Sequence, residues 1–164
     1  MSLPNIELSE TVTGALLLAT QATLQALELP GLNEGRFHVR KALWDTGLTD
    51  FPLCLIAPAS LGVDWNAGTN EREDITHSIS VAFVAAGNRT ADQTNLGLLL
   101  HWEERARRRF LNQVDMSGLV LPGGATINRT NINPPSETFL SAAMRIGWDA
   151  QYLIIGYQVR EPRT

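Results

Sequence analysis

The residues best suited to chemistry are the four arginines at positions 105 and 107–109, in the stretch HWEERARRRF (101–110). Guanidinium groups bind phosphate and carboxylate oxygens through paired N–H donors. Three interpretations are open: a solvated face near a helix C-terminus, where the macrodipole favours positive charge; salt bridges to another subunit; and a nucleic-acid-binding patch. The net charge of −4 and the lack of aromatic residues between the arginines count against the nucleic-acid interpretation.

Motifs that usually mark an active site or a metal site are missing from the sequence. There is no glycine-rich phosphate loop, no H-E-x-x-H, no C-x-x-C and no nucleophile elbow. The histidines, His38, His77 and His101, are widely separated, and His77 occupies an apolar strand position typical of a hydrogen-bonded core histidine. We therefore expect no catalytic residue, no cofactor and no metal, and predict that the protein is not an enzyme.

Length and composition predict a single domain over residues 1–164. The chain is 44% hydrophobic and 18% charged, which is enough apolar content to form a core. The single cysteine, Cys54, lies within the apolar run PLCLIAP and is interpreted as a small core residue. The longest apolar run is far shorter than the roughly 18 residues of a membrane span, so no membrane partner is expected.

The arginines belong to a segment, 91–114, whose apolar residues repeat with helical periodicity. Its predicted core face consists of Leu96, Leu99, Leu100, Ala106, Phe110, Leu111 and Val114. Glu103 and Arg107 fall in the middle of this face, four residues apart and in the order that favours a helix ion pair. Because a charged pair on an apolar face is costly, it is expected either inside the fold or against a second chain.

Other elements must position this helix. The preceding sequence predicts an amphipathic helix at 9–29, short strands at 37–44 and 51–59, and a long alternating strand at 74–87. Residues 58–74 are rich in glycine, asparagine and charge, and they carry Trp65. They predict an extended loop or an open hairpin tip.

The last third of the chain predicts further strands. One is the segment ATINRTNI (125–132), and 139–160 contains two alternating runs, with Met144, Ile146 and Trp148 in the first. The residues WDAQ between these runs are either a hairpin turn or a bulge in one long strand. The order of elements predicts an α+β fold with one domain, a mixed and mostly antiparallel sheet, and two helices packed on one face.

This order resembles that of the tail terminator, or tail completion, proteins of tailed bacteriophages. The resemblance lies in the order and spacing of five segments: TVTGALLLATQATLQAL, FPLCLIAPA, ISVAFV, LGLLLHWEERARRRF and YLIIGYQVREPR. Related neck and head-closure proteins share much of this outline. The resemblance therefore implies a virion structural protein that is assembled in the host cytoplasm and resides in the tail or neck.

The implied function is a hexameric ring that caps the tail tube and docks it to the head–neck connector. Its partners would be other copies of the chain, the tail tube protein, connector proteins, and genomic DNA passing through the lumen without sequence-specific contact. A ring needs subunit interfaces, for which the candidates are Glu103, Arg105, Arg107, Arg108, Arg109 and Trp65. The alternatives are a neck or head-closure adaptor and a small nucleic-acid-binding module that uses Arg105–Arg109.

Overall fold

A computed structural model gives the fold and describes residues 2–43, 48, 50–64, 72–89, 94–111, 116 and 119–162. The helices are α1 (Val12–Ala26), α2 (Leu96–Phe110) and α3 (Glu137–Ile146). The strands are β1 (Phe37–Val39), β2 (Leu53–Asp64), β3 (Arg72–Ala86), β4 (Thr126–Asn133) and β5 (Asp149–Pro162). Short 3-10 turns are formed by Leu8–Glu10, Glu34–Arg36 and Pro122–Gly124.

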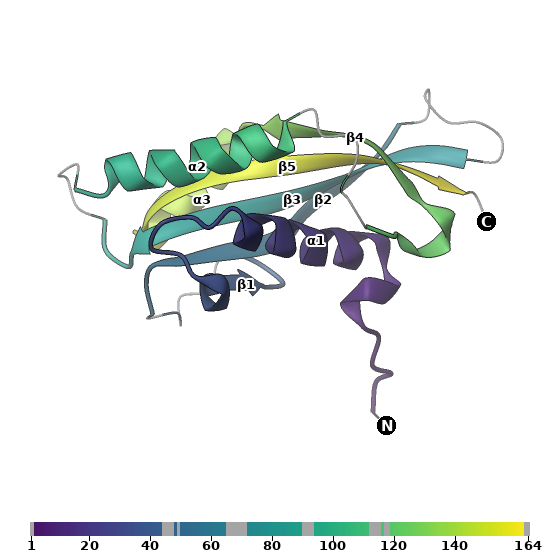
Figure 1. The fold of residues 1–164 in the computed structure, drawn as a ribbon, viewed down its shortest axis with the longest axis horizontal. Helices are drawn as coiled ribbons and strands as arrows, with labels where there is room; N and C mark the ends of the chain where they lie inside the picture. Colours follow the sequence, from purple (N-terminus) through teal and green to yellow (C-terminus); the bar gives the residue numbers. More distant parts are fainter. Residues whose placement is uncertain are drawn as a thin grey trace.

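The strands form one sheet in the order β1-β2-β3-β5-β4. β1 pairs with β2 in parallel, and the other neighbours are antiparallel. The long strand β3 lies at the centre and pairs with β2 on one side and β5 on the other along nearly its whole length (Figure 1). The predicted alternation of 74–87 is confirmed, because alternate side chains of β3 enter two different hydrophobic cores.

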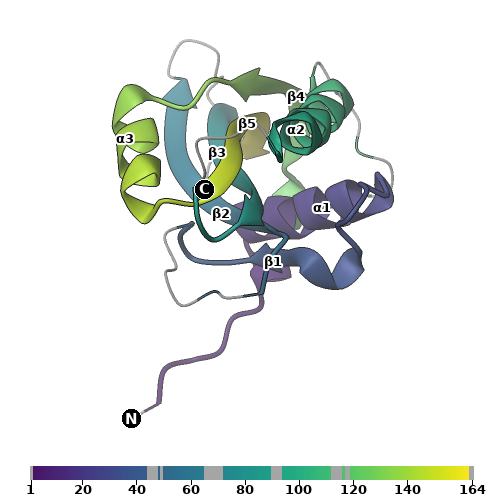
Figure 2. The same cartoon turned by 90° about the vertical axis from the view of Figure 1, so that its left-hand side faces the viewer.

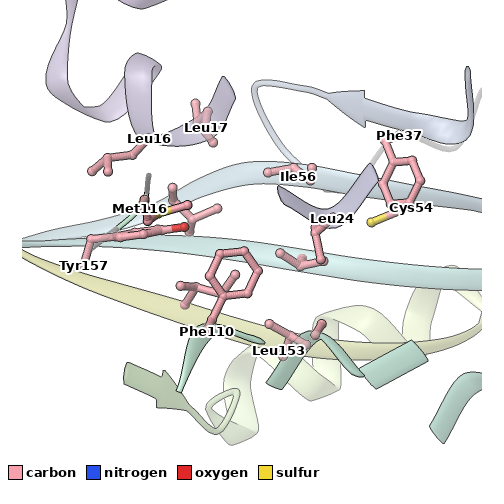
Figure 3. Close-up of a cluster of buried hydrophobic side chains, with 14 of the residues drawn as sticks. Leu16, Leu17, Leu24, Phe37, Cys54, Ile56, Phe110, Met116, Leu153 and Tyr157 are labelled. Atoms are coloured by element: carbon pink, nitrogen blue, oxygen red, sulfur yellow. The ribbon is translucent and has the colours of Figure 1, made fainter. Parts of the chain in front are cut away.

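The larger core lies between the sheet and the layer formed by α1 and α2. It packs apolar side chains of both helices against those of β2, β3 and β5, including Leu16, Leu24, Phe110, Ile56 and Leu153 (Figure 3). Cys54 is fully buried in this core, where burial raises the pKa of its thiol. The interpretation of Cys54 as a core residue is therefore confirmed.

The smaller core lies on the opposite face of the sheet, beneath α3 (Figure 2). The α+β class, the single domain and the mixed, mostly antiparallel sheet are confirmed, with α1 and α2 on one face. The two-helix prediction omitted α3, since residues 139–148 were predicted as a strand. That prediction is wrong: Glu137–Ile146 is helical, and the second alternating run continues in the single long strand β5.

The reason for the error is visible in the local sequence. Ser136 caps α3 by accepting a hydrogen bond from the backbone N–H of Phe139 at 3.1 Å, and Gly147 ends it in the left-handed conformation at φ 76°. Phe139, Ala143 and Ile146 point toward the sheet and follow helical spacing. A period of two and a period of 3.6 residues are hard to separate over ten residues. Here the capping residues Ser136 and Gly147 mark the segment as a helix.

Element boundaries also differ from the predictions. The first strand is limited to Phe37–Val39 within the predicted 37–44. β2 and β3 continue through much of the predicted loop 58–74, and their last paired residues are Asp64 and Asp74. The hairpin interpretation is therefore favoured, although its tip, 65–71, lies outside the described residues.

The caps of α3 provide a stability test. We expect Ser136→Ala to lower the free energy of unfolding by about 1 kcal/mol through loss of the N-cap. Gly147→Ala should cost about 1–2 kcal/mol, because alanine is strained at positive φ. Ser141→Ala, at an exposed position inside α3, is the control and should be neutral or slightly stabilising. Urea unfolding curves would measure all three, and a strand at 137–146 would show no such pattern.

Candidate subunit interface

The helix that carries the arginines, α2, buries a different face from the predicted one, because it is rotated about its axis. Its buried residues are Leu99, Trp102, Ala106 and Phe110. Trp102 was not assigned to the core face, yet it is fully buried and its indole N–H donates to the Pro30 carbonyl at 2.8 Å. Leu96, Leu100 and Leu111, which were predicted to be core residues, are exposed, and Val114 lies outside the described residues.

The rotation places the Glu103–Arg107 pair on the flank of α2 instead of the core face. The Arg107 Nε and a Glu103 carboxylate oxygen are 3.4 Å apart, and the side chains are 49% and 24% exposed. The expectation that the pair lies inside the fold is wrong. Arg108 forms a second pair with Glu104, and this pair is more exposed. Both pairs remain candidates for contact with another chain.

Arg105 serves the fold of its own chain. Its Nη2 group donates to the carbonyl of Leu27 at 3.0 Å, and Leu27 is the C-cap residue of α1. A cation at a helix C-terminus satisfies an open carbonyl and complements the macrodipole. Arg109 is half-buried on the same flank, near Tyr157. Of the candidate arginines, Arg107 and Arg108 are therefore the ones most available to a partner.

Exposed leucines lie along one side of α2 and at its C-cap. Leu96, Leu100 and the C-cap residue Leu111, named here the leucine stripe, are 41–50% exposed, and the Glu103–Arg107 pair lies on the same side of the helix between Leu100 and Leu111. Because Trp102 and Arg105 bind the end of α1, the stripe faces the opposite flank of α2. That flank overlooks β4, the edge strand of the sheet (Figure 2).

Further apolar side chains are exposed elsewhere. Leu3, Ile6 and Leu8 lie in a segment that leaves the body before α1, and α3 presents Leu140 and Met144 (Figure 1). Single exposed apolar residues are normal on protein surfaces, so only those that share an element, such as Leu140 and Met144 on α3, are candidates for contact. These residues were not among the predicted interface candidates. The apolar residues of SLPNIEL, ahead of the first predicted helix, were the available signal in the sequence.

The far end of the sheet is held by polar contacts. Arg160 donates from Nε and Nη2 to the two carboxylate oxygens of buried Asp74 at 2.8 and 3.1 Å. His77 lies between the Thr13 hydroxyl at 2.8 Å and the Glu161 carboxylate at 3.3 Å. The interpretation of His77 as a hydrogen-bonded core histidine is confirmed. These contacts fasten the start of α1 to β3 and β5 beside the hairpin.

Nothing in the described part of the chain resembles a metal centre, because no three histidine, cysteine or acidic side chains cluster there. Among the same residues, no helix is long and apolar enough to cross a membrane. Trp65, the remaining interface candidate, lies outside the described residues.

A comparison of folds finds a similar solved structure. The structure is similar to the PVC sheath/tube terminator of an extracellular contractile injection system in its extended state, with a TM-score of 0.54 and 14% sequence identity. The likeness covers 100% of this chain and 58% of that chain, so this chain spans well under two thirds of the terminator's length. No family model and no curated protein matches the sequence. The protein thus has a terminator-like fold.

The two roles of the arginines can be separated by stability. Arg105→Ala should lower the free energy of unfolding by roughly 1–2 kcal/mol, because it removes a charged donor from the α1 carbonyl. Arg108→Ala should cost less than about 0.5 kcal/mol, since exposed helix pairs contribute little. Chemical denaturation of both variants measures the difference. Equal effects would contradict a structural role for Arg105.

Asp74 predicts a dependence of stability on pH. The hydrogen bond from Arg160 lowers the pKa of Asp74, against the opposing effect of burial. The folded pKa therefore lies below the unfolded value of about 3.9, so the contribution is present above about pH 4 and is lost as pH falls through the folded pKa. We expect Asp74→Asn to flatten the acid limb of a plot of melting temperature against pH. An unchanged limb would show that other carboxylates control it.

Proposed function

We propose that the protein is a tail terminator: a structural protein that assembles into a ring, caps the tube of a phage tail or a related contractile particle, and stops its growth. The observation that carries the proposal is the likeness of fold, over the whole chain, to a sheath/tube terminator. Because one fold can host many functions, the surface has to supply a second argument.

That argument comes from the exposed apolar side chains. They occur on the segment before α1, on α2 and on α3 (Figure 1). A ring of identical subunits needs two different patches on each copy for its own closure, and a cap needs a further face for the tube. Exposed apolar groups on separate elements supply surfaces for several contacts of this kind.

The finer parts of the proposal concern the ring's size and neighbours. We propose a hexamer that rests on the tail tube protein, meets connector proteins on its other side, and leaves a lumen through which DNA passes. A neck or head-closure adaptor would have the same kind of ring without the effect on tube growth. A nucleic-acid-binding module is not proposed, because the net charge of −4 opposes phosphate binding and Arg105 is held by the Leu27 carbonyl of its own chain.

The first test is the mass of the purified protein by light scattering on a sizing column, followed by negative-stain images. We expect annular particles with a mass of about six chains. When the protein is added to polymerising tail tube subunits, tubes should stop elongating and carry a cap at one end. A protein that forms rings but leaves tube growth unchanged would be a neck adaptor instead. A protein that stays monomeric even with tubes would contradict the proposal.

Charge reversal tests the role of α2 in the ring. The double variant Arg107→Glu, Arg108→Glu should assemble less well at a given concentration. Each substitution places a negative charge beside Glu103 or Glu104, and it also reverses the charge that faces the partner subunit. Its melting temperature should fall only slightly, since both side chains are exposed. Assembly identical to that of the unmodified protein would exclude these arginines from the interface.

A further inference from the structure

The segment that precedes α1 is an arm without a binding place on its own chain. Within residues 2–7, named here the arm, Leu3 is 92% and Ile6 is 64% exposed. The hydrogen bonds from Asn5 to the Glu7 carboxylate and from the Glu7 N–H to the Glu10 carboxylate stay within the first residues of the chain. Both views show the arm projecting away from the sheet (Figures 1 and 2). Apolar side chains on an extended arm gain free energy only when another surface covers them.

A matching acceptor lies at the opposite side of the molecule. β4 ends the sheet, and none of the strands in the described part of the chain pairs with its outer edge. Such an edge presents N–H and C=O groups to any extended segment. The leucine stripe of α2 stands above this edge, with Leu100 44% exposed. An extended segment can therefore add to the sheet beside β4.

The two faces of β4 agree with the two faces of the arm. Thr130 and Ile132 of β4 point toward α2 and the larger core, whereas Arg129, Asn131 and Asn133 face the other way because strand side chains alternate. In an extended arm, Pro4 and Ile6 share one side, and Leu3, Asn5 and Glu7 share the other. An added arm would set Ile6 toward the leucine stripe. It would also set Glu7 on the side of Arg129, an opposite charge.

We propose that the arm of one subunit adds to the sheet of the next as a strand beside β4, with its apolar side under the leucine stripe of α2. The occupant is a second copy, since the arm leaves its own body on the side away from β4 (Figure 2). Donor and acceptor on opposite sides make the contact heterologous, and repetition of such a contact closes a ring. The inference rests on the proposed ring function for that closure, but the pairing itself can be tested separately.

Complementation of two defective variants is the sharper test. Ile6→Asp impairs the arm and leaves the surface of β4 and α2 that accepts it intact. Leu100→Asp impairs that accepting surface and leaves the arm intact. Each variant alone should lose the large species and elute as a folded monomer. An equimolar mixture should give a mass of two chains, because one arm and one acceptor remain compatible. Leu140→Asp, at an equally exposed leucine of α3 (42% against 44%), is the matched control and should assemble normally.

A peptide separates this inference from the ring function. Synthetic SLPNIELS, residues 2–9, is titrated onto full-length Ile6→Asp protein, and hydrogen exchange of the β4 amides is followed. Outer-edge amides should exchange about tenfold more slowly when the peptide is at ten times its dissociation constant. The same peptide carrying Ile6→Asp should give no protection.

Together the two tests distinguish a failure of the arm inference from a failure of the proposed ring function. If the protein forms rings but Ile6→Asp assembles normally and the peptide leaves β4 unprotected, the arm inference is overturned and the ring stands. If the peptide protects β4 but no ring forms and tubes grow unchecked, the arm pairing is supported and the terminator function fails. Protection of α3 or β1 instead of β4 would overturn the assignment of the acceptor.

Discussion

The structure depends on β3, the strand whose two faces are both covered. Ile79, Val81 and Phe83 enter the core beneath α1 and α2, while Ala82 and Val84 enter the core beneath α3. A strand that is apolar on both sides can only be stable between two layers. β2 and β5, which pair with β3 along its length, are constrained in the same way. The three helices are therefore the cover that this central strand requires.

The way in which the helices cover the sheet determines which apolar side chains stay exposed. Trp102 binds the Pro30 carbonyl in the turn after α1, and Arg105 binds the carbonyl of the α1 C-cap residue Leu27, so both hydrogen bonds hold α2 at one rotation about its axis. At that rotation Leu99, Ala106 and Phe110 are buried and the leucine stripe is not. A small turn toward the predicted face would bury Leu96 and Leu100 and expose the indole of Trp102. The exposed stripe is thus a consequence of the α1–α2 contact.

The sequence was sufficient for the parts of the fold that have a long, clear period. The alternating strand β3, the helices α1 and α2, and the α+β class were predicted. The buried face of α2 was not predicted correctly. A helical wheel assigns leucines to the core and contains no information about the hydrogen bond from Trp102 to Pro30. α3 was missed because Met144, Ile146 and Trp148 alternate by chance over a helix that Ser136 and Gly147 delimit. The edge position of β4 depends on strand order, which local sequence does not encode.

A terminator must be able to assemble without continuing to grow, and the proposed arm contact meets this requirement through its geometry. A head-to-tail contact that fails to close leaves one free arm and one free sheet edge at its ends, and each addition restores them. Closure pairs every arm with an edge and leaves neither for another copy. The ring then ends its own polymerisation by saturating its contacts. α3 and the β2–β3 hairpin take no part in the proposed pairing.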